Sequence, residues 1–116
     1  MIMELTEHEK FLNEEAHRKI GVEAVYRMVK VDRRDGPLPP KYKPIIGKTF
    51  VFDRTPQIGL RMEMTFVLTD ENNVPLRFYG WGTRRLVDMD PDRLIFTTPK
   101  AIYYCEFVNG KTPFNA

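Results

Sequence analysis

The stretch RMEMTFVLT, residues 61–69, decides how this chain folds. Apolar side chains occur at every second position of it: Met62, Met64, Phe66 and Leu68. Polar side chains fill the positions between them, with the one exception of Val67. Because successive side chains of a strand point to opposite faces of a sheet, this period of two predicts an antiparallel strand with one buried face.

The same alternation recurs along the rest of the chain. It predicts further strands over residues 48–53, 75–82, 92–98 and 101–108, joined by short turns rich in Gly, Pro, Asp and Asn. Residues 22–32 fit a helix or a strand, and their Val and Tyr content favours a strand. Residues 33–47 contain four prolines and are predicted to form an extended surface loop with polyproline character.

The N-terminal segment predicts a helix within residues 1–21. Thr6 and Glu9 have the spacing of a capping box, in which each side chain accepts a hydrogen bond from the other residue's backbone N–H. An apolar stripe at helical spacing follows, made of Phe11, Leu12, Ala16 and Ile20. We expect this stripe to lie against the sheet and the helix to end near Gly21.

Together these elements predict an α+β domain. An N-terminal helix precedes an antiparallel six-stranded meander that forms a curved sheet or a β-barrel, with residues 109–116 as a tail. The 116 residues, of which 42% are hydrophobic and 29% charged, suffice for one domain with one core.

Composition and charge narrow the class of protein. A formal net charge of +2 creates no general field for nucleic acid. The single cysteine, Cys105, excludes an internal disulfide and fits a reducing compartment. The start of the chain has neither the basic region nor the apolar run of a signal peptide or membrane anchor. We therefore expect a cytosolic protein that does not associate with membranes.

No motif predicts a cofactor or a metal. Residues 47–49, GKT, match the end of a phosphate-binding loop, but the earlier glycine of that motif is missing and a strand follows. Three acidic residues have the spacing of calcium ligands: Asp88, Asp90 and Asp92. Pro91 lies among them, so a turn is the better interpretation. His8 and His17 are two to three helical turns apart, too far to share one metal.

The segment RFYGWGTRRLVD, residues 77–88, raises a question about binding. Gly80 and Gly82 are expected to break the strand ladder, as at bulges and barrel corners, with Trp81 on the bend. On one interpretation Trp81 packs into the end of the core. On the other, it lines the mouth of a pocket in which Arg84 or Arg85 faces an anionic group.

The candidate ligand-binding residues include neighbours of this segment. They are Met64, Phe78, Trp81, Arg84, Arg85 and Tyr104. Tyr104 shares a strand face with Glu106, and these two are the candidate catalytic residues. On a concave face they would place a phenol and a carboxylate inside a cavity, and on a convex face they would be surface residues.

The order of three segments resembles the first half of calycin-type barrels, such as phenolic acid decarboxylases and MoaF-like proteins. The segments are IGKTFVFDR (46–54), LRFYGWGTRR (76–85) and AIYYCEFVNG (101–110). The resemblance, over residues 46–110, implies a barrel shape. Where those decarboxylases carry first-strand tyrosines this chain has Phe52 and Arg54, and Asn109 stands near the position of their glutamate, so decarboxylation is not implied. Six strands are fewer than the eight of a lipocalin-sized barrel, so closure would involve a second copy of the chain.

Three functional hypotheses remain. The first is a small binding protein, without catalysis and as a homodimer, that holds an apolar or aromatic ligand, or a protein partner, on a concave aromatic face. The second is a single-stranded nucleic-acid-binding module, with phosphate contacts from Arg33, Arg34, Lys41, Lys43, Arg84 and Arg85. The third is a small lyase or isomerase that uses Tyr104 and Glu106 as acid and base.

Overall fold

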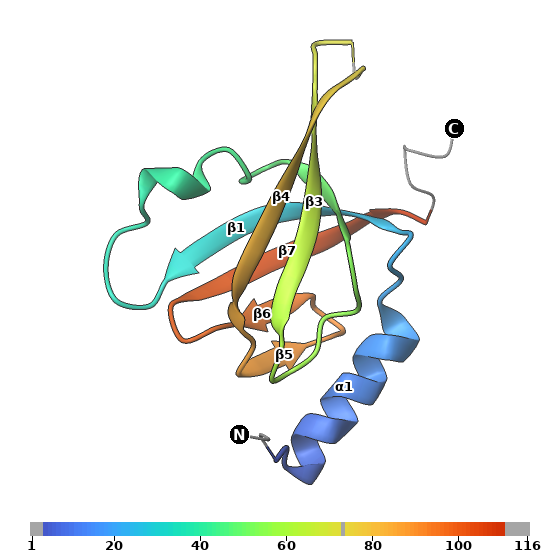
Figure 1. Cartoon of the computed structure of the whole chain (residues 1–116), viewed down its shortest axis with the longest axis vertical. Helices are drawn as coiled ribbons and strands as arrows, with labels where there is room; N and C mark the ends of the chain where they lie inside the picture. The colour runs from blue at the N-terminus through green and yellow to red at the C-terminus, as the bar shows by residue number, and fades with distance from the viewer. Residues whose placement is uncertain (1–3, 73, 111–116) are drawn as a thin grey trace.

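The computed structural model describes residues 4–72 and 74–110, which form one α-helix, one short 3-10 helix and one antiparallel sheet (Figure 1). In chain order the elements are α1 (Glu7–Lys19), β1 (Val25–Arg33), η1 (Pro40–Tyr42), β2 (Thr49–Phe52), β3 (Arg61–Thr69), β4 (Pro75–Arg85), β5 (Asp88–Asp90), β6 (Ile95–Thr97) and β7 (Ala101–Asn109). The α+β prediction is confirmed. Residues 111–116 of the expected tail lie outside the described residues.

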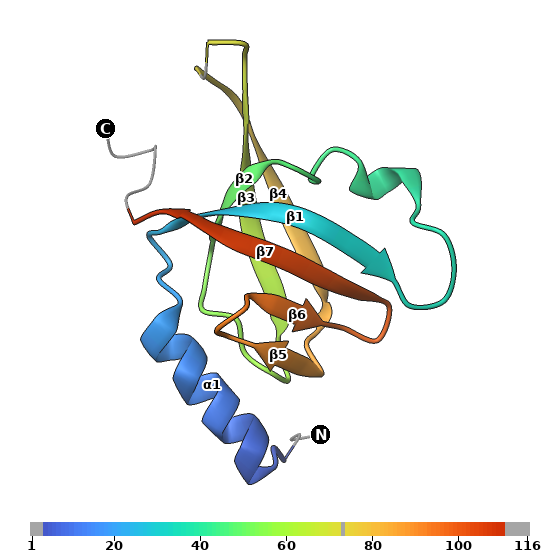
Figure 2. The ribbon, with the colours of Figure 1, turned by 180° about the vertical axis from the view of Figure 1, so that it is seen from behind.

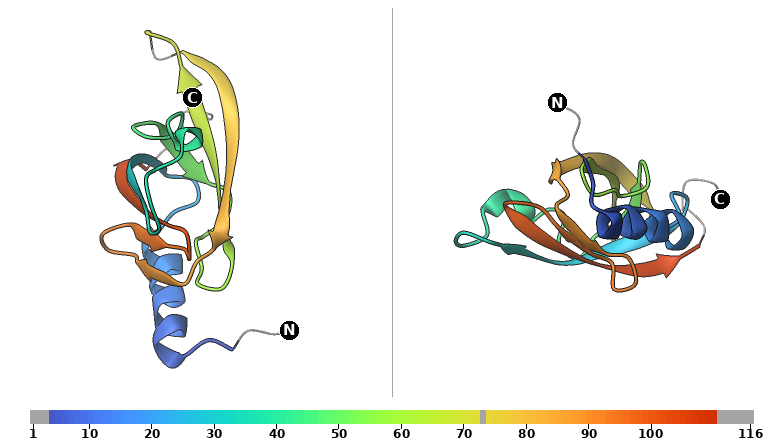
Figure 3. Two further views of the ribbon diagram at one scale, coloured as in Figure 1. Left: turned by 90° about the vertical axis from the view of Figure 1, so that its left-hand side faces the viewer. Right: turned by 90° about the horizontal axis from the view of Figure 1, so that it is seen from below.

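The sheet is curved and not closed. Its strand order is β4-β3-β2-β1-β7-β6-β5, so the first and last strands of the chain pair at its centre. Seen from opposite sides, the arm of β3 and β4 crosses over the arm of β1 and β7 (Figures 1 and 2). The two edge strands, β4 and β5, are separated by only Leu86 and Val87, which brings the edges together at one end of the sheet (Figure 3).

The sheet has seven strands where the sequence predicted six. The additional strand is β5, whose three residues pair with β6 in the register of Met89 with Phe96. Its sequence was interpreted as part of a turn because three residues are too few to show alternation. Residues 22–32, which fitted both a helix and a strand, contain most of β1, which is held by backbone pairing with β2 on one side and β7 on the other.

The expectation that Gly80 and Gly82 break the ladder is wrong for Gly80, whereas an irregularity of the ladder begins directly after Gly82. β4 runs through both, with Gly80 opposite Thr65 and Gly82 opposite Glu63, and the register shifts between Gly82 and Arg85 and again between Pro75 and Arg77. Ladder hydrogen bonds join backbone atoms, so a residue without a side chain takes part in them. Gly80 therefore lies in regular pairing, and Gly82 lies at the start of the irregular end of the β3–β4 ladder.

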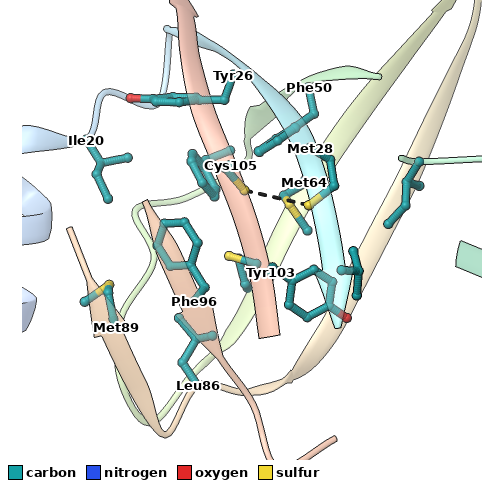
Figure 4. Close-up of a cluster of buried hydrophobic side chains, with 14 of the residues drawn as sticks. Ile20, Tyr26, Met28, Phe50, Met64, Leu86, Met89, Phe96, Tyr103 and Cys105 are labelled. Carbon is teal, nitrogen blue, oxygen red and sulfur yellow. Dashed lines mark hydrogen bonds between the residues drawn. The ribbon is translucent and has the colours of Figure 1, made fainter. Parts of the chain in front are cut away.

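The core lies between the two crossing arms (Figure 4). As the alternation in residues 61–69 predicts, Met62, Met64 and Phe66 are at most 1% exposed. They pack among further buried side chains from other strands of the sheet, including Met28 of β1, Phe50 and Phe52 of β2 and Phe96 of β6. One face of the sheet thus supplies most of the apolar burial that stabilises the fold.

The α1 helix begins as its capping box predicts. The Thr6 hydroxyl accepts from Glu9 N at 3.1 Å, and the Glu9 carboxylate accepts from Thr6 N at 2.8 Å. Ala16 and Ile20 of the apolar stripe are buried, whereas Phe11 is 53% exposed. No helix within residues 4–72 and 74–110 is both long and apolar enough to cross a membrane.

Asn13 of α1 joins the helix to the loop before β3. Its Oδ1 accepts from Ile58 N at 2.7 Å and its Nδ2 donates to Ile58 O at 3.4 Å, and Asn13 is buried. Because these bonds satisfy both backbone groups of one buried residue, they fix the position of the helix against the sheet.

The proline-containing loop is less extended than predicted. Within it η1 begins at Pro40, a residue suited to the first turn of a helix because its missing N–H would be unsatisfied there. Tyr42 and Ile45 are buried, so the loop is anchored to the core by apolar side chains. This docking places Lys41 and Tyr42 beside β4.

Candidate functional site

A cavity of about 360 Å³ lies between β4 and the ends of β1 and β7. Its described lining consists of Arg33, Lys41, Tyr42, Arg61, Trp81, Gly82, Thr83, Arg84, Thr98, Lys100 and Tyr103. Five of these side chains are cationic, and none of the described lining residues is a carboxylate. We call this cavity the cationic pocket.

Three aromatic rings form one wall of the cationic pocket. The Tyr42 ring centroid lies 5.3 Å from that of Trp81 and 6.4 Å from that of Tyr103. Tyr42 and Tyr103 are buried, and Trp81 is half-buried. Tyr103 points inward from β7, next to the core residues labelled in Figure 4. The wall is therefore rigid on the core side and accessible at Trp81.

Two of the cations share one carboxylate. Arg33 Nε donates to Asp35 Oδ1 at 3.0 Å, and Lys100 Nζ lies 3.6 Å from Asp35 Oδ2. Desolvation opposes ionisation of Asp35, but the charges of Arg33 and Lys100 outweigh it and lower the pKa of this carboxyl group. Arg33 also donates to the Tyr42 hydroxyl at 3.4 Å, which orients the aromatic wall.

The remaining cations, Lys41, Arg61 and Arg84, form no ion pair with any described residue. Arg61 is held by its Nε, which donates to the Thr83 carbonyl oxygen at 2.8 Å. A Cβ at Gly82 would lie 2.7 Å from Arg61 Nη2. Glycine at position 82 thus leaves room for the Arg61 side chain to cross β4.

Two buried threonines brace the backbone around the pocket. Thr83 Oγ1 accepts from Met62 N at 3.1 Å and donates to Arg84 O at 2.6 Å, which spans the irregular end of the β3–β4 ladder. Thr98 Oγ1 accepts from Ala101 N at 3.0 Å and closes the turn that carries Lys100. The basic side chains are therefore attached to a fixed backbone.

Burial raises the pKa of the Tyr103 hydroxyl above its usual range, so this phenol is neutral and able to donate a hydrogen bond at physiological pH. The indole of Trp81 lies close enough to counter part of that increase. Even so, the buried Nε1 of Trp81 makes no hydrogen bond with a described residue. This N–H is therefore a buried donor next to the Tyr103 hydroxyl in the pocket wall.

The candidate ligand-binding residues lie in different parts of the structure and do not form one site. Trp81 and Arg84 line the cationic pocket. Phe78 lies on the opposite face of β4 and is 59% exposed, and Met64 is fully buried in the core. Arg85 lines a separate cavity of about 320 Å³ beside α1. One aromatic and one arginine from the predicted segment therefore meet in the pocket.

Tyr104 and Glu106, the candidate catalytic residues, face away from the core. Glu106 pairs with Arg27 at 2.6 Å, and Lys30 Nζ lies 5.0 Å from the centroid of the Tyr104 ring. Neither residue lines the cationic pocket. The register of β7 instead places their neighbour Tyr103 on the inner face.

Sequence reasoning missed part of the pocket. Tyr42, Arg61, Lys100 and Tyr103 were not among the candidate ligand-binding residues, and Arg33 and Lys41 were considered only as contacts for nucleic acid. A signal existed for Tyr42, an aromatic residue between two lysines in a polar loop. For the others the signal is absent, because they are ordinary residues of strands and turns that meet only in the folded chain.

The cavity between α1 and β5 and the Cys105 thiol are weaker candidates for a functional site than the cationic pocket. A cavity of about 420 Å³ between α1 and β5 is lined by Asp88, Asp90 and Asp92, and Lys19 pairs with Asp92. Among the described residues, no three His, Cys, Asp or Glu side chains lie close enough to hold a metal ion. Burial raises the pKa of the Cys105 thiol, whose Sγ lies 3.8 Å from Met28 Sδ in the core, so it is an unreactive thiol (Figure 4).

No protein-family model, curated protein or solved structure matches this chain. Its function is therefore argued from the cationic pocket itself.

Proposed function

We propose that this protein binds a small anionic ligand in the cationic pocket, with the ligand's apolar part against the aromatic wall. The observation that carries the proposal is a small cavity with five cationic side chains, three aromatic rings and no carboxylate in its described lining. This narrows the hypothesis drawn from the sequence, because an apolar ligand without charge would leave these cations unneutralised.

The chemistry of the lining supports binding. Arginine presents paired N–H donors that match two oxygens of a carboxylate or phosphate. The described lining holds neither a carboxylate nor an imidazole, which are the usual general bases, so we propose binding without catalysis. The neutral hydroxyl of Tyr103, which lines the pocket, adds a hydrogen-bond donor for a ligand oxygen.

Calorimetric titration with inorganic phosphate and with benzoate tests the proposal. We expect at least one of these anions to bind and raise the unfolding temperature. Arg84→Ala should weaken binding at least about tenfold, since a charge-assisted hydrogen bond contributes about 1.5–3 kcal/mol. The matched control is Arg93→Ala, whose side chain is 80% exposed and outside the pocket. Equal affinities of the two variants, or no binding by the wild type, would contradict the proposal.

A second candidate is single-stranded nucleic acid. Arg33 and Lys41 lie in the pocket with Arg84 and a half-buried tryptophan, so phosphates and a stacked base would find partners in one place. Affinity for a short oligonucleotide should then fall steeply between low and physiological salt. An affinity that hardly changes with salt would remove this candidate.

The assembly and cellular setting are also proposals. We propose a cytosolic protein, supported by a single buried thiol, and a homodimer, supported by the open edges at β4 and β5. The resemblance to calycin-type barrels remains a proposal supported by the curvature of the sheet. Native mass spectrometry of the purified chain tests the dimer, and a monomer at micromolar concentration would contradict it.

A further inference from the structure

We propose that the ligand of the cationic pocket is an aryl phosphate, meaning a phosphate monoester whose ester group carries an aromatic or heteroaromatic ring. This inference rests on the proposed function and names the class of anion. Three features of the pocket support it: its charge, the arrangement of its arginines and the position of Trp81.

The charge of the pocket favours a dianion. Asp35 is the one described carboxylate paired with any of the five cations, so four positive charges remain around the cavity. A carboxylate ligand would neutralise one of them, whereas a phosphate monoester, with a second pKa near about 6, neutralises close to two at neutral pH. Because like charges gathered around one cavity repel one another, and a dianion offsets more of that repulsion than a monoanion does, the dianion is the better match.

The arrangement of the arginines favours a phosphate over a carboxylate. Arg61 and Arg84 come from the neighbouring strands β3 and β4, and Lys41 reaches the same cavity from η1. Because Arg61 is anchored through Nε, its two terminal nitrogens are the donors left for a ligand. Phosphate has three terminal oxygens and can engage several such groups from different directions, which a planar carboxylate cannot.

Trp81 favours an aromatic ester group. It is the half-buried member of the aromatic wall, and its ring centroid lies 5.3 Å from that of Tyr42 and 6.3 Å from that of Tyr79. A ring placed at the open part of Trp81 would complete an aromatic cluster while the phosphate meets the cations. The volume of about 360 Å³ is near the lower end for small-molecule sites, which suits one ring system with its phosphate.

Four probes at constant ionic strength and pH 8 test this inference by calorimetry: phenyl phosphate, inorganic phosphate, benzoate and phenol. We expect phenyl phosphate to bind at least about tenfold more tightly than any of the other three. Lowering the pH to 5 should weaken its binding, since the ester then carries one charge. Tighter or equal binding of benzoate, or of inorganic phosphate, overturns the aryl phosphate while leaving anion binding in place. Absence of binding by all four overturns both proposals.

Two variants test whether Trp81 contacts the aromatic ring of the ligand and whether Arg84 contacts its phosphate. Trp81→Leu should abolish the preference for phenyl phosphate over inorganic phosphate and leave the affinity for inorganic phosphate within about twofold. Arg84→Gln should weaken both phosphate probes and leave their ratio unchanged. Circular dichroism verifies folding, and Trp81→Phe replaces the leucine variant if that one does not fold, with a smaller loss of preference expected. An unchanged preference in a folded Trp81 variant overturns the ring contact.

Discussion

At position 82 the absence of a side chain determines where a charge lies. The Arg61 side chain passes over Gly82 on the neighbouring strand, and its Nη2 occupies the place that a Cβ would need. Gly80, two residues earlier on the same strand, has open space around its Cβ position. The two glycines share a strand and a face, yet only Gly82 makes room for a pocket residue.

We therefore predict that Gly82→Val displaces the Arg61 guanidinium and weakens phenyl phosphate binding about tenfold, the value of one charge-assisted contact. Stability should hardly change, because the atom that must move is the end of a flexible side chain. Calorimetry measures the affinity, and Gly80→Val is the matched control. Combining Gly82→Val with Arg61→Gln should add little to either change, since both remove the same contact. Equal affinities of the two valine variants would refute this role of Gly82.

The Cys105 thiol makes stability depend on pH. Burial raises its pKa in the folded state, while in the unfolded chain it ionises near about 8.5. The folded state thus retains a proton that the unfolded state releases, so this contribution to stability is complete below pH 8.5 and decreases as the pH rises. The buried hydroxyls of Tyr26 and Tyr103 act in the same direction above about pH 10.

We predict that the free energy of unfolding of the wild type falls between pH 8 and pH 9.8, with a limiting slope of about 1.4 kcal/mol per pH unit. In Cys105→Ala the slope over this interval should be smaller, whatever the variant's stability at pH 7. Urea denaturation at several pH values measures both slopes. Parallel curves for the two proteins would show that this thiol does not titrate on unfolding.

At the scale of elements, α1 is attached to the rest of the fold both by apolar packing and by a pair of buried hydrogen bonds. Ala16 and Ile20 supply buried apolar surface, but such surface permits sliding and rotation. The two hydrogen bonds between Asn13 and Ile58 have a direction, and they fix the register of the helix against the loop before β3.

Asn13→Ala should therefore destabilise the fold by about 2 kcal/mol or more, because it leaves the buried N–H and C=O of Ile58 without partners. Urea denaturation measures the change, and Glu14→Ala, at the exposed neighbouring position, is the control. A change at Asn13 no larger than that at Glu14 would mean that water or a shifted backbone replaces these bonds.

At the scale of the whole molecule, the chain completes its open sheet by pairing its first strand with its last. Arg27 and Glu106, which face each other across β1 and β7, are 79 positions apart. This pairing also places Arg33 beside the turn that carries Lys100, so the same long-range step that completes the sheet assembles the cationic pocket.

We predict that refolding takes milliseconds to seconds, as in other domains dominated by contacts between distant residues. Fluorescence of Trp81, the single tryptophan, reports the process in a stopped-flow instrument. Adding phenyl phosphate should slow unfolding more than it speeds refolding, because the pocket is complete only in the native state. Refolding within microseconds would contradict this dependence on the β1–β7 pairing.

The sequence by itself determined the features that depend on neighbouring residues. Alternation over residues 61–69 predicted β3 and its buried face, and the spacing of Thr6 and Glu9 predicted the start of α1. Both are local, since a strand's two faces and a helix cap are set within a few residues. β5 escaped prediction because its three residues gain their strand geometry from pairing with β6.

Only the tertiary structure decided which residues meet. Trp81 and Arg84 were candidates from a single segment, but their neighbours in the pocket come from β1, η1, β3 and β7, which are distant in sequence. Whether Tyr103 or Tyr104 faces inward depends on the register between β1 and β7, and a shift of one residue would exchange them. Register is set by the packing of the whole core, so no local pattern contains it.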